Sequence, residues 1–298
     1  MENKINLKEE IGRLSAKTKF SSKLLEKDYH LTRILHKISE QKIKNLVFKG
    51  GTCLNKCYLG FYRLSEDLDF IYNEDVKSLS KPQIKRILDE LRRKLFEILN
   101  ALEFRTNKEL GNGWKMLTSI DEPRITGLEI ITNYDSLIDN SIQAIKIDVS
   151  FREKLRKPTK MRIIRHEFID ALGGQILKKD VEIEVINLAE NFAEKFRALL
   201  LRKNIAIRDI YDIYFILKKG ILKINKEIIG LILLKINESK KDNFTKQDLI
   251  KFIDHLGFKL SDLNEKEISS LLKYDERVNV KEMIHLIVSE FQNACRIK

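Results

Sequence analysis

Two aspartates stand one residue apart inside an apolar run, in the stretch RLSEDLDFIY at residues 63–72. If this run is a β-strand, Asp67 and Asp69 point to one face, while Leu68 and Phe70 point to the other. On an exposed edge strand the two aspartates would be ordinary surface acids. Side by side, two carboxylates repel each other unless a cation or a proton lies between them. Oxygen ligands favour a hard divalent ion such as Mg²⁺, so the pair predicts a metal site.

A third carboxylate occurs in the stretch AIKIDVSF at residues 144–151. Asp148 faces opposite to Ile147 and Val149, so a single charged group interrupts an apolar strand and needs a partner. An adjacent strand would bring it to the first two aspartates. Three carboxylates can hold two metal ions, one activating an attacking hydroxyl group and one bridging nucleotide phosphates. Lys146 would share the face of Asp148 and could tune it.

A glycine pair, Gly50 and Gly51, stands in VFKGGT between a predicted strand and a predicted helix. A helix N-terminus presents free N–H groups to an anion, and glycines let a phosphate approach the backbone closely. We expect Thr52 to cap the helix and to reach a phosphate oxygen. A simple tight turn is the alternative. Arg63 and Ser65 flank the two aspartates and either bind phosphate or fix the loop through bonds to the backbone.

The elements that position these residues follow from the periodicity of apolar residues. It predicts helices over 21–38, 52–58 and 82–102 and strands over 45–48 and 67–72. Several antiparallel strands are expected between residues 104 and 185. Later helices are expected over 188–202, 209–217, 226–236, 246–256, 265–272 and 280–294. The predicted fold class is therefore α+β, with a mixed or antiparallel sheet in a domain at 1–186 and a helical domain at 187–298.

The charge balance of the 298 residues is strongly basic, with 56 Lys and Arg against 44 Asp and Glu and a net charge of +12. This surplus favours a polyanionic partner through counterion release. Compositional drift towards Lys, Ile and Asn is the alternative explanation. The N-terminus is polar and reads as no signal peptide, and the longest apolar run, at 228–234, is too short to span a bilayer. We therefore expect a cytoplasmic protein with no membrane partner.

In this order, the motifs resemble the AbiEii-type toxin family of type IV toxin–antitoxin systems. That family includes the MenT-like transferases and lies in the nucleotidyltransferase superfamily of DNA polymerase β-like fold. The resemblance covers residues 27 to about 217 and rests on KDYHLTRIL, FKGGTCLNK, RLSEDLDF, IKIDVSF, ENFAEKFRAL and RDIYDIYFI. It implies a polymerase β-like first domain and a helical bundle that contributes to the active-site cleft. It also implies Mg²⁺ or Mn²⁺ as cofactor, an NTP substrate and a cognate antitoxin.

The resemblance assigns roles to residues of the first domain. Gly51 and Thr52 take the place of the superfamily's glycine–serine pair, and the threonine keeps the hydroxyl group. Asp67 and Asp69 match the metal-binding pair. Asp148 matches the third carboxylate, in more variable surroundings. The same residues were reached from strand periodicity alone, so the two arguments agree on the predicted metal ligands.

The resemblance also assigns roles to residues of the helical domain. Lys195 matches a lysine that contacts the nucleotide triphosphate. Asp209 and Asp212 match an RDxxD motif, whose first aspartate is implicated in activity and whose second we place in nucleotide binding. From the residues themselves, capping and a salt bridge to Arg208 would also explain the aspartates. Lys195 would equally suit a solvated helix surface.

The function implied is a Mg²⁺-dependent nucleotidyltransferase that moves an NMP from an NTP onto a hydroxyl group and releases pyrophosphate, as a toxin or phage-defence enzyme. The basic charge favours an RNA acceptor, and a tRNA 3′ end is the first expectation because related toxins modify tRNA. Transfer to a protein side chain, or an inactive nucleotide- or RNA-binding module, are the alternatives. The candidates for RNA contact in the helical tail include Arg202, Lys203, Lys218, Lys219, Lys240 and Lys241.

Overall fold

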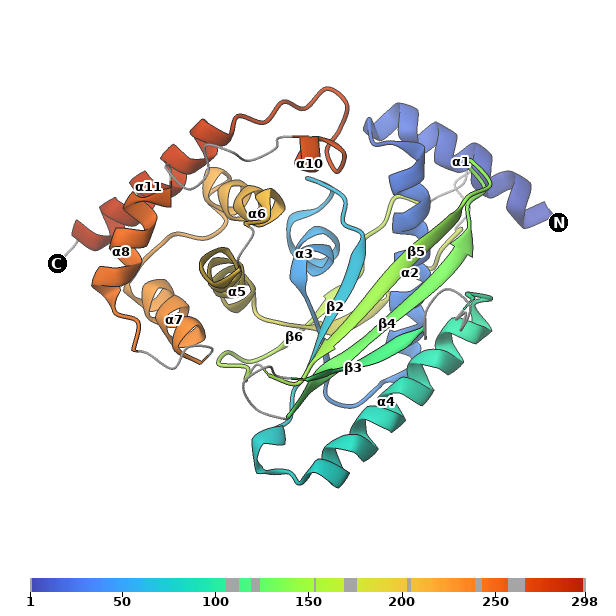
Figure 1. Ribbon diagram of the computed structural model, residues 1–298. Helices are drawn as coiled ribbons and strands as arrows, with labels where there is room; N and C mark the ends of the chain where they lie inside the picture. The colour runs from blue at the N-terminus through green and yellow to red at the C-terminus, as the bar shows by residue number, and fades with distance from the viewer. Residues whose placement is uncertain are drawn as a thin grey trace. The chain divides into compact units, whose positions relative to one another are not determined.

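The computed structural model describes residues 2–105, 113–118, 124–152, 154–168, 176–202, 205–238, 243–256 and 266–296. The chain divides into two compact units, Met1–Ile186 and Asn187–Lys298. Figure 1 shows a mixed sheet with helices in the first unit and helices in the second. Within the described ranges, no helix is both long and apolar enough to cross a membrane.

The first unit contains a seven-stranded sheet with the strand order β3-β4-β5-β2-β1-β7-β6. The strands are β1 Leu46–Lys49, β2 Asp67–Tyr72, β3 Trp114–Thr118, β4 Ile125–Asp135, β5 Ile142–Ser150, β6 Lys160–Ile163 and β7 Glu182–Val185. Neighbouring strands run antiparallel except at two places, where β2 pairs with β5 and β1 pairs with β7 in parallel. The predicted mixed sheet is confirmed.

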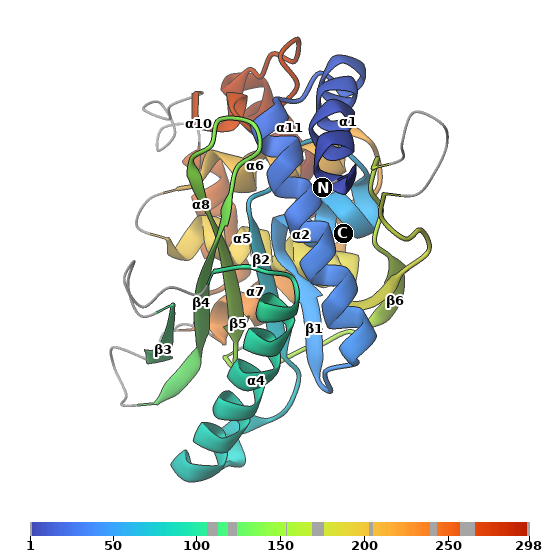
Figure 2. The ribbon, with the colours of Figure 1, turned by 90° about the vertical axis from the view of Figure 1, so that its right-hand side faces the viewer.

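Two long helices, α2 (Ser22–Gln41) and α4 (Lys81–Ala101), cover one face of this sheet, as Figures 1 and 2 show. Their leucines and isoleucines pack with the apolar residues of the strands in one core. The side chain of Ser21 caps α2 by accepting a hydrogen bond from the backbone N–H of Leu24 at 3.3 Å. A capping box of Ser80 and Gln83 begins α4. Both helices confirm their predictions to within three residues.

The first helix, α1 (Glu2–Thr18), has no counterpart among the predicted elements. Its apolar residues are few, but Ile11 and Leu14 are fully buried. They pack in a small second core with Leu64, which lies in the loop before β2. The helix therefore supports the loop that leads into the aspartate strand.

The helix expected over residues 52–58 differs in its start and in its type. A short α-helix, α3 (Gly50–Cys53), begins two residues earlier, and a π-helix, η1 (Leu54–Leu59), continues it. Lys49 is the N-cap residue and makes no side-chain cap hydrogen bond, so the expectation that Thr52 caps this helix is wrong. The glycine pair lies inside the first turn.

A buried ion pair joins this helical segment to α2. The side chain of Lys56 is fully buried, with Nζ 2.8 Å from Oδ1 of Asp28 and 2.7 Å from Oγ1 of Thr32. A buried ammonium group is tolerated only when charged and polar partners compensate it. The pair therefore fixes the π-helix, and the glycine turn before it, against α2.

The described elements of the second unit are all helical. They are α5 Leu188–Leu201, α6 Ile207–Lys218, α7 Lys226–Asn237, α8 Lys246–Asp254, α10 Lys266–Ser269 and α11 Val280–Arg296. Helix α5 packs against α6 and α7, and α11 packs against α6 and α8. Between α5 and α7, the fully buried Lys235 places Nζ 2.5 Å from Glu190 and 3.1 Å from Glu194. Each of these helices confirms a predicted one within a few residues.

Replacing the buried ammonium group should destabilise the first unit. We expect Lys56→Met to cost about 3–5 kcal/mol, because it leaves the carboxylate of Asp28 buried without its counter-charge. Urea unfolding can be followed through the only tryptophan, Trp114, which lies in the first unit. The control is Arg93→Ala, which removes an exposed ion pair to Glu97 at 2.7 Å and should cost less than about 1 kcal/mol. A Lys56→Met protein as stable as the control would contradict the assignment.

Candidate active site

Charged side chains form a row that crosses the sheet from β3 to β1. The strand register pairs Lys115 with Glu129, Glu129 with Asp148, Asp148 with Asp69, and Asp69 with Lys49. Residues directly opposite each other on neighbouring strands share a face of the sheet. The row therefore lies on one face, and three of its five members are acidic.

Along β2, the aspartates lie on one face and the apolar residues beside them point into the core, as the sequence alternation predicts. Asp67 and Asp69 are half-buried, whereas Leu68 and Phe70 are completely buried in the core under α2 and α4. The parallel pairing of β2 with β5 places Asp148 directly opposite Asp69. The structure thus brings together the three aspartates that the sequence singles out, on the face of the sheet away from the main core.

Asp148 has one oxygen engaged and one free of protein partners. Nζ of Lys146 lies 2.8 Å from its Oδ2. Its Oδ1 is buried, with no hydrogen-bond partner in the described structure. Burial raises the pKa of Asp148, the ammonium group of Lys146 opposes this rise, and the carboxylates of Asp69 and Glu129 add to it. The net result is a carboxylate whose charge is poorly compensated.

Glu129 on β4 is a site residue that the sequence analysis missed. Its side chain is only 11% exposed, and it pairs with Nζ of Lys115 at 2.7 Å and with Nζ of Lys146 at 3.3 Å. Burial would raise the pKa of Glu129, but these two ammonium groups lower it. It is the only charged residue in the run RITGLEIITNY after its first position. The signal that identified Asp148 was therefore present here as well.

The two glycines give space to side chains of the protein itself. Gly50 has a φ of +78°, and a Cβ atom there would collide with Oδ2 of Asp69. A Cβ atom on Gly51 would lie 2.5 Å from Nη2 of Arg63 and 3.3 Å from Oγ of Ser65. Sequence reasoning assigned this space to a phosphate group. In the structure, the space at Gly50 admits the carboxylate of Asp69.

Thr52 and Arg63 both bond to the backbone around β2. Oγ1 of Thr52 donates a hydrogen bond to the carbonyl oxygen of Asp67 at 2.5 Å, and the side chain is buried. Arg63 is 1% exposed, and its Nη1 donates to the carbonyl oxygen of Leu64 at 2.9 Å. Of the two roles left open for Arg63, the structure contains the loop-fixing bond. Ser65 lies beside the glycine turn, half-buried.

The candidates of the second unit form a cluster of their own between α5 and α6. Nζ of Lys195 lies 2.7 Å from Oδ1 of Asp209 and 2.9 Å from Oδ2 of Asp212, and Arg202 also pairs with Asp209. Lys195 is 9% exposed, so its alternative as a solvated helix residue is wrong. Asp209 lies in the first turn of α6 but does not cap it, because Ala206 is the N-cap residue.

The first-unit carboxylates fit a hard divalent cation in their chemistry. Asp67, Asp69 and Asp148 offer oxygen ligands, and Asp148, with Oδ1 unpartnered, carries charge that a cation would compensate. Throughout the described ranges, no three His, Cys, Asp or Glu side chains are already arranged as a metal-binding group. Binding by all three aspartates therefore requires side-chain movement, and Lys146 already pairs with Oδ2 of Asp148 at 2.8 Å.

Comparison with known proteins finds a family model that matches most of the chain. The profile of a family described as nucleotidyl transferase AbiEii toxin, type IV toxin–antitoxin system, matches residues 33–282. No curated protein matches the chain.

Two solved Helicobacter pylori structures share the fold. JHP933 has a TM-score of 0.53 at 15% identity and covers 92% of this chain and 93% of its own. A second protein, whose name proposes a nucleotidyltransferase, has a TM-score of 0.52 at 16% identity and covers 92% and 96%. At these identities the likeness shows the fold alone.

The raised pKa of Asp148 predicts a pH-dependent effect of its removal. We expect Asp148→Asn to raise the thermal unfolding temperature of metal-free protein at neutral pH. The folded state binds a proton at Asp148 more tightly than the unfolded chain does. The charged form therefore costs stability above the folded pKa, and this cost disappears as the pH falls below the ordinary carboxyl value of about 4. The stabilising effect of the substitution should disappear over the same range.

The control for this measurement is Asp89→Asn. Asp89 lies on α4 with a 44% exposed side chain and pairs with Arg92. Its removal should change the unfolding temperature little at any pH, because an exposed ion pair contributes little. A lower unfolding temperature of Asp148→Asn at neutral pH would contradict the prediction.

Proposed function

This chain belongs to the family of AbiEii nucleotidyl transferase toxins of type IV toxin–antitoxin systems, and from that premise we propose a specific reaction for it. Membership makes the protein a nucleotidyltransferase that uses an NTP and a divalent metal ion and that is accompanied by an antitoxin. We propose further that the metal ion is Mg²⁺ and that the acceptor is an RNA, with the 3′ end of a tRNA as the first candidate.

The observation that carries the proposal is the alignment of Asp69 with Asp148 and the unpartnered Oδ1 of Asp148. In the proposed reaction, the acceptor oxygen attacks the α-phosphorus of the NTP, and the bond to the pyrophosphate group breaks. Oδ1 of Asp148 takes the proton of the acceptor hydroxyl group, a role favoured by the raised pKa of this carboxyl group. Asp67, Asp69 and Oδ2 of Asp148 would hold the cation, which would neutralise phosphate charge when bound.

We assign the triphosphate to Lys195 of the second unit, following the family resemblance. Its pairing with Asp209 and Asp212 supports a fixed orientation for the ammonium group. The same pairing means that Lys195→Ala would remove a buried counter-charge from Asp212 and leave Arg202 as the ion-pair partner of Asp209. Lys195→Arg, which keeps the charge, is therefore the better probe of this assignment.

A basic segment supports an RNA acceptor. Residues 152–165 carry seven Lys and Arg and begin four residues after Asp148. Of these, Arg152, Lys160 and Arg165 are exposed and make no ion pair with any described residue. Such side chains can contact phosphates without first breaking a bond within the protein. The segment also includes β6, one of the two edge strands of the sheet.

The helical-tail candidates are less suited to this role than the sequence indicated. Nζ of Lys218 lies 3.2 Å from Glu282 and 2.5 Å from the hydroxyl group of Tyr214, so it is already engaged. Lys219 lies over the ring of Phe215 at 5.8 Å. Lys203, Lys240 and Lys241 lie outside the described residues, and Arg202 pairs with Asp209. We therefore place the proposed RNA contacts in residues 152–165.

The acceptor class can be tested directly with labelled NTPs. The full-length protein is incubated with each labelled NTP, total RNA and Mg²⁺, with Asp69→Asn as the inactive control. We expect label in RNA that RNase removes, and a reduction of at least about 10³-fold in the control, as expected when a group that stabilises transition-state charge is lost. Label in protein that survives RNase would replace the RNA acceptor with a protein one. No label with any NTP would favour a binding module.

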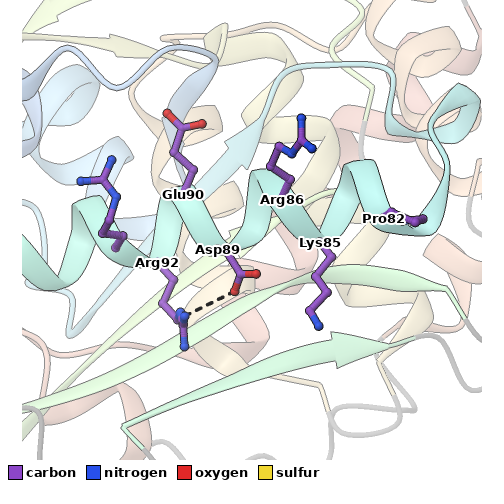
Figure 3. A pocket seen from close by; sticks show the side chains of 7 residues that line it. Pro82, Lys85, Arg86, Asp89, Glu90 and Arg92 are labelled. Carbon is purple, nitrogen blue, oxygen red and sulfur yellow. Dashed lines mark ion pairs between the residues drawn. The ribbon is translucent and has the colours of Figure 1, made fainter.

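Charge reversal in the basic segment should flatten the salt dependence of RNA binding. Replacing Arg152 and Lys160 together with Glu should reduce the log–log slope by about 1.4, at roughly 0.7 for each phosphate of a single strand. The matched control reverses Lys85 and Arg86, the same change in net charge. Figure 3 shows both on α4, the helix that covers the core face of the sheet. Equal effects of the two double variants would show that only net charge matters and would remove residues 152–165 from the interface.

A further inference from the structure

Lys146 lies between two acidic side chains at the edge of the carboxylate site. Its Nζ is 2.8 Å from Oδ2 of Asp148 and 3.3 Å from Oε2 of Glu129. We propose that Lys146 is a built-in counter-ion that competes with the divalent cation for Asp148. We propose in addition that Glu129 is the acceptor that draws Lys146 away when the cation binds. The inference rests on the metal role of Asp148 in the proposed function and adds two residues that regulate it.

The strand geometry places Lys146 where a cation would otherwise be needed. It precedes Asp148 by two residues on β5, so both side chains project from the same face. The register sets Asp67 of β2 opposite Lys146 on one side, and Ile131 of β4 opposite on the other. The ammonium group thus lies in the same acidic field that would attract Mg²⁺. Two cations near one carboxylate repel each other, so each weakens the binding of the other.

Glu129 has its two oxygens divided between two lysines. Its Oε1 forms an ion pair with Nζ of Lys115 at 2.7 Å, and its Oε2 forms one with Nζ of Lys146. Nζ of Lys146 lies between the two carboxylates and is closer to Asp148. A shift of the Lys146 side chain toward Glu129 would therefore free Oδ2 of Asp148. Because the side chain of Lys146 is 40% exposed, it has room to move. Oδ1 of Asp148, which has no hydrogen-bond partner, needs no such release.

This arrangement makes opposite predictions for the two residues. Lys146→Gln removes the competitor, so divalent-ion binding should tighten about tenfold, as expected for the loss of a nearby like charge. Glu129→Gln removes the alternative acceptor and leaves Lys146 on Asp148, so binding should weaken by roughly threefold. If Glu129 acts only through Lys146, the double variant should bind the ion as tightly as Lys146→Gln does, within about twofold.

The experiment measures Mn²⁺ binding to the full-length protein by the electron paramagnetic resonance signal of the free ion, without NTP or RNA. Lys146→Arg keeps the positive charge and should restore the weaker affinity of the unmodified protein. Fluorescence of Trp114 in each variant establishes that the first unit is folded. Asp69→Asn removes a proposed ligand and should abolish the tight site in every background.

Three results would overturn the inference. If Lys146→Gln leaves the affinity unchanged or weaker, Lys146 does not compete with the ion. If Glu129→Gln still weakens binding in the double variant, Glu129 acts on the ion directly, through its charge or as a ligand, and not through Lys146. If the unmodified protein and Asp69→Asn bind Mn²⁺ alike, the metal assignment of the proposed function fails and the inference fails with it. Failure of the RNA acceptor alone would leave all these binding curves unchanged.

Discussion

Asp69, Asp148 and Glu129 lie in one row across three adjacent strands. Their carboxylates repel each other in the folded protein, and this repulsion has to be compensated. Lys146 and Lys115 supply part of the compensation, and the unpartnered oxygen of Asp148 marks what is left. The apolar residues on the reverse side of the same strands hold the row in place by packing under α2 and α4. Repulsion among the carboxylates of the site thus lowers the stability of the first unit, and the burial of apolar side chains in its core offsets this loss.

A lysine ammonium group also lies between two carboxylates at other places in the molecule. Lys235 lies between Glu190 and Glu194, and Lys195 between Asp209 and Asp212. These lysines are buried, so their partners are required for folding. Lys146 differs because its side chain is 40% exposed, which leaves it free to exchange partners. Exposure therefore separates a lysine that can exchange partners from lysines whose ammonium groups are held in a fixed orientation.

Local pattern predicted the elements well where alternation or capping was strong. β2 was expected over 67–72 and is found there, because apolar residues on one face and acids on the other leave a single register. Helix α1 was missed because its apolar residues are few; they pack with Phe20 and Leu25 of the next segment as well as with the distant Leu64. The parallel pairing of β2 with β5 is a non-local choice that no window of sequence contains. For the same reason, the glycine turn could be recognised, but its occupant, Asp69, could not.

The parallel pairing of β2 with β5 also determines how early during protein synthesis the carboxylate site can form. Positions 69 and 148 are separated by about 80 residues, which a ribosome adds in roughly 4–16 s at 5–20 residues per second. Until β5 has left the ribosome, the growing chain exposes two aspartates with no third to join them. Synthesis from the N-terminus therefore imposes a delay on the assembly of the carboxylate row. In a toxin built on this topology, the carboxylate row cannot assemble before about half of the chain has been made.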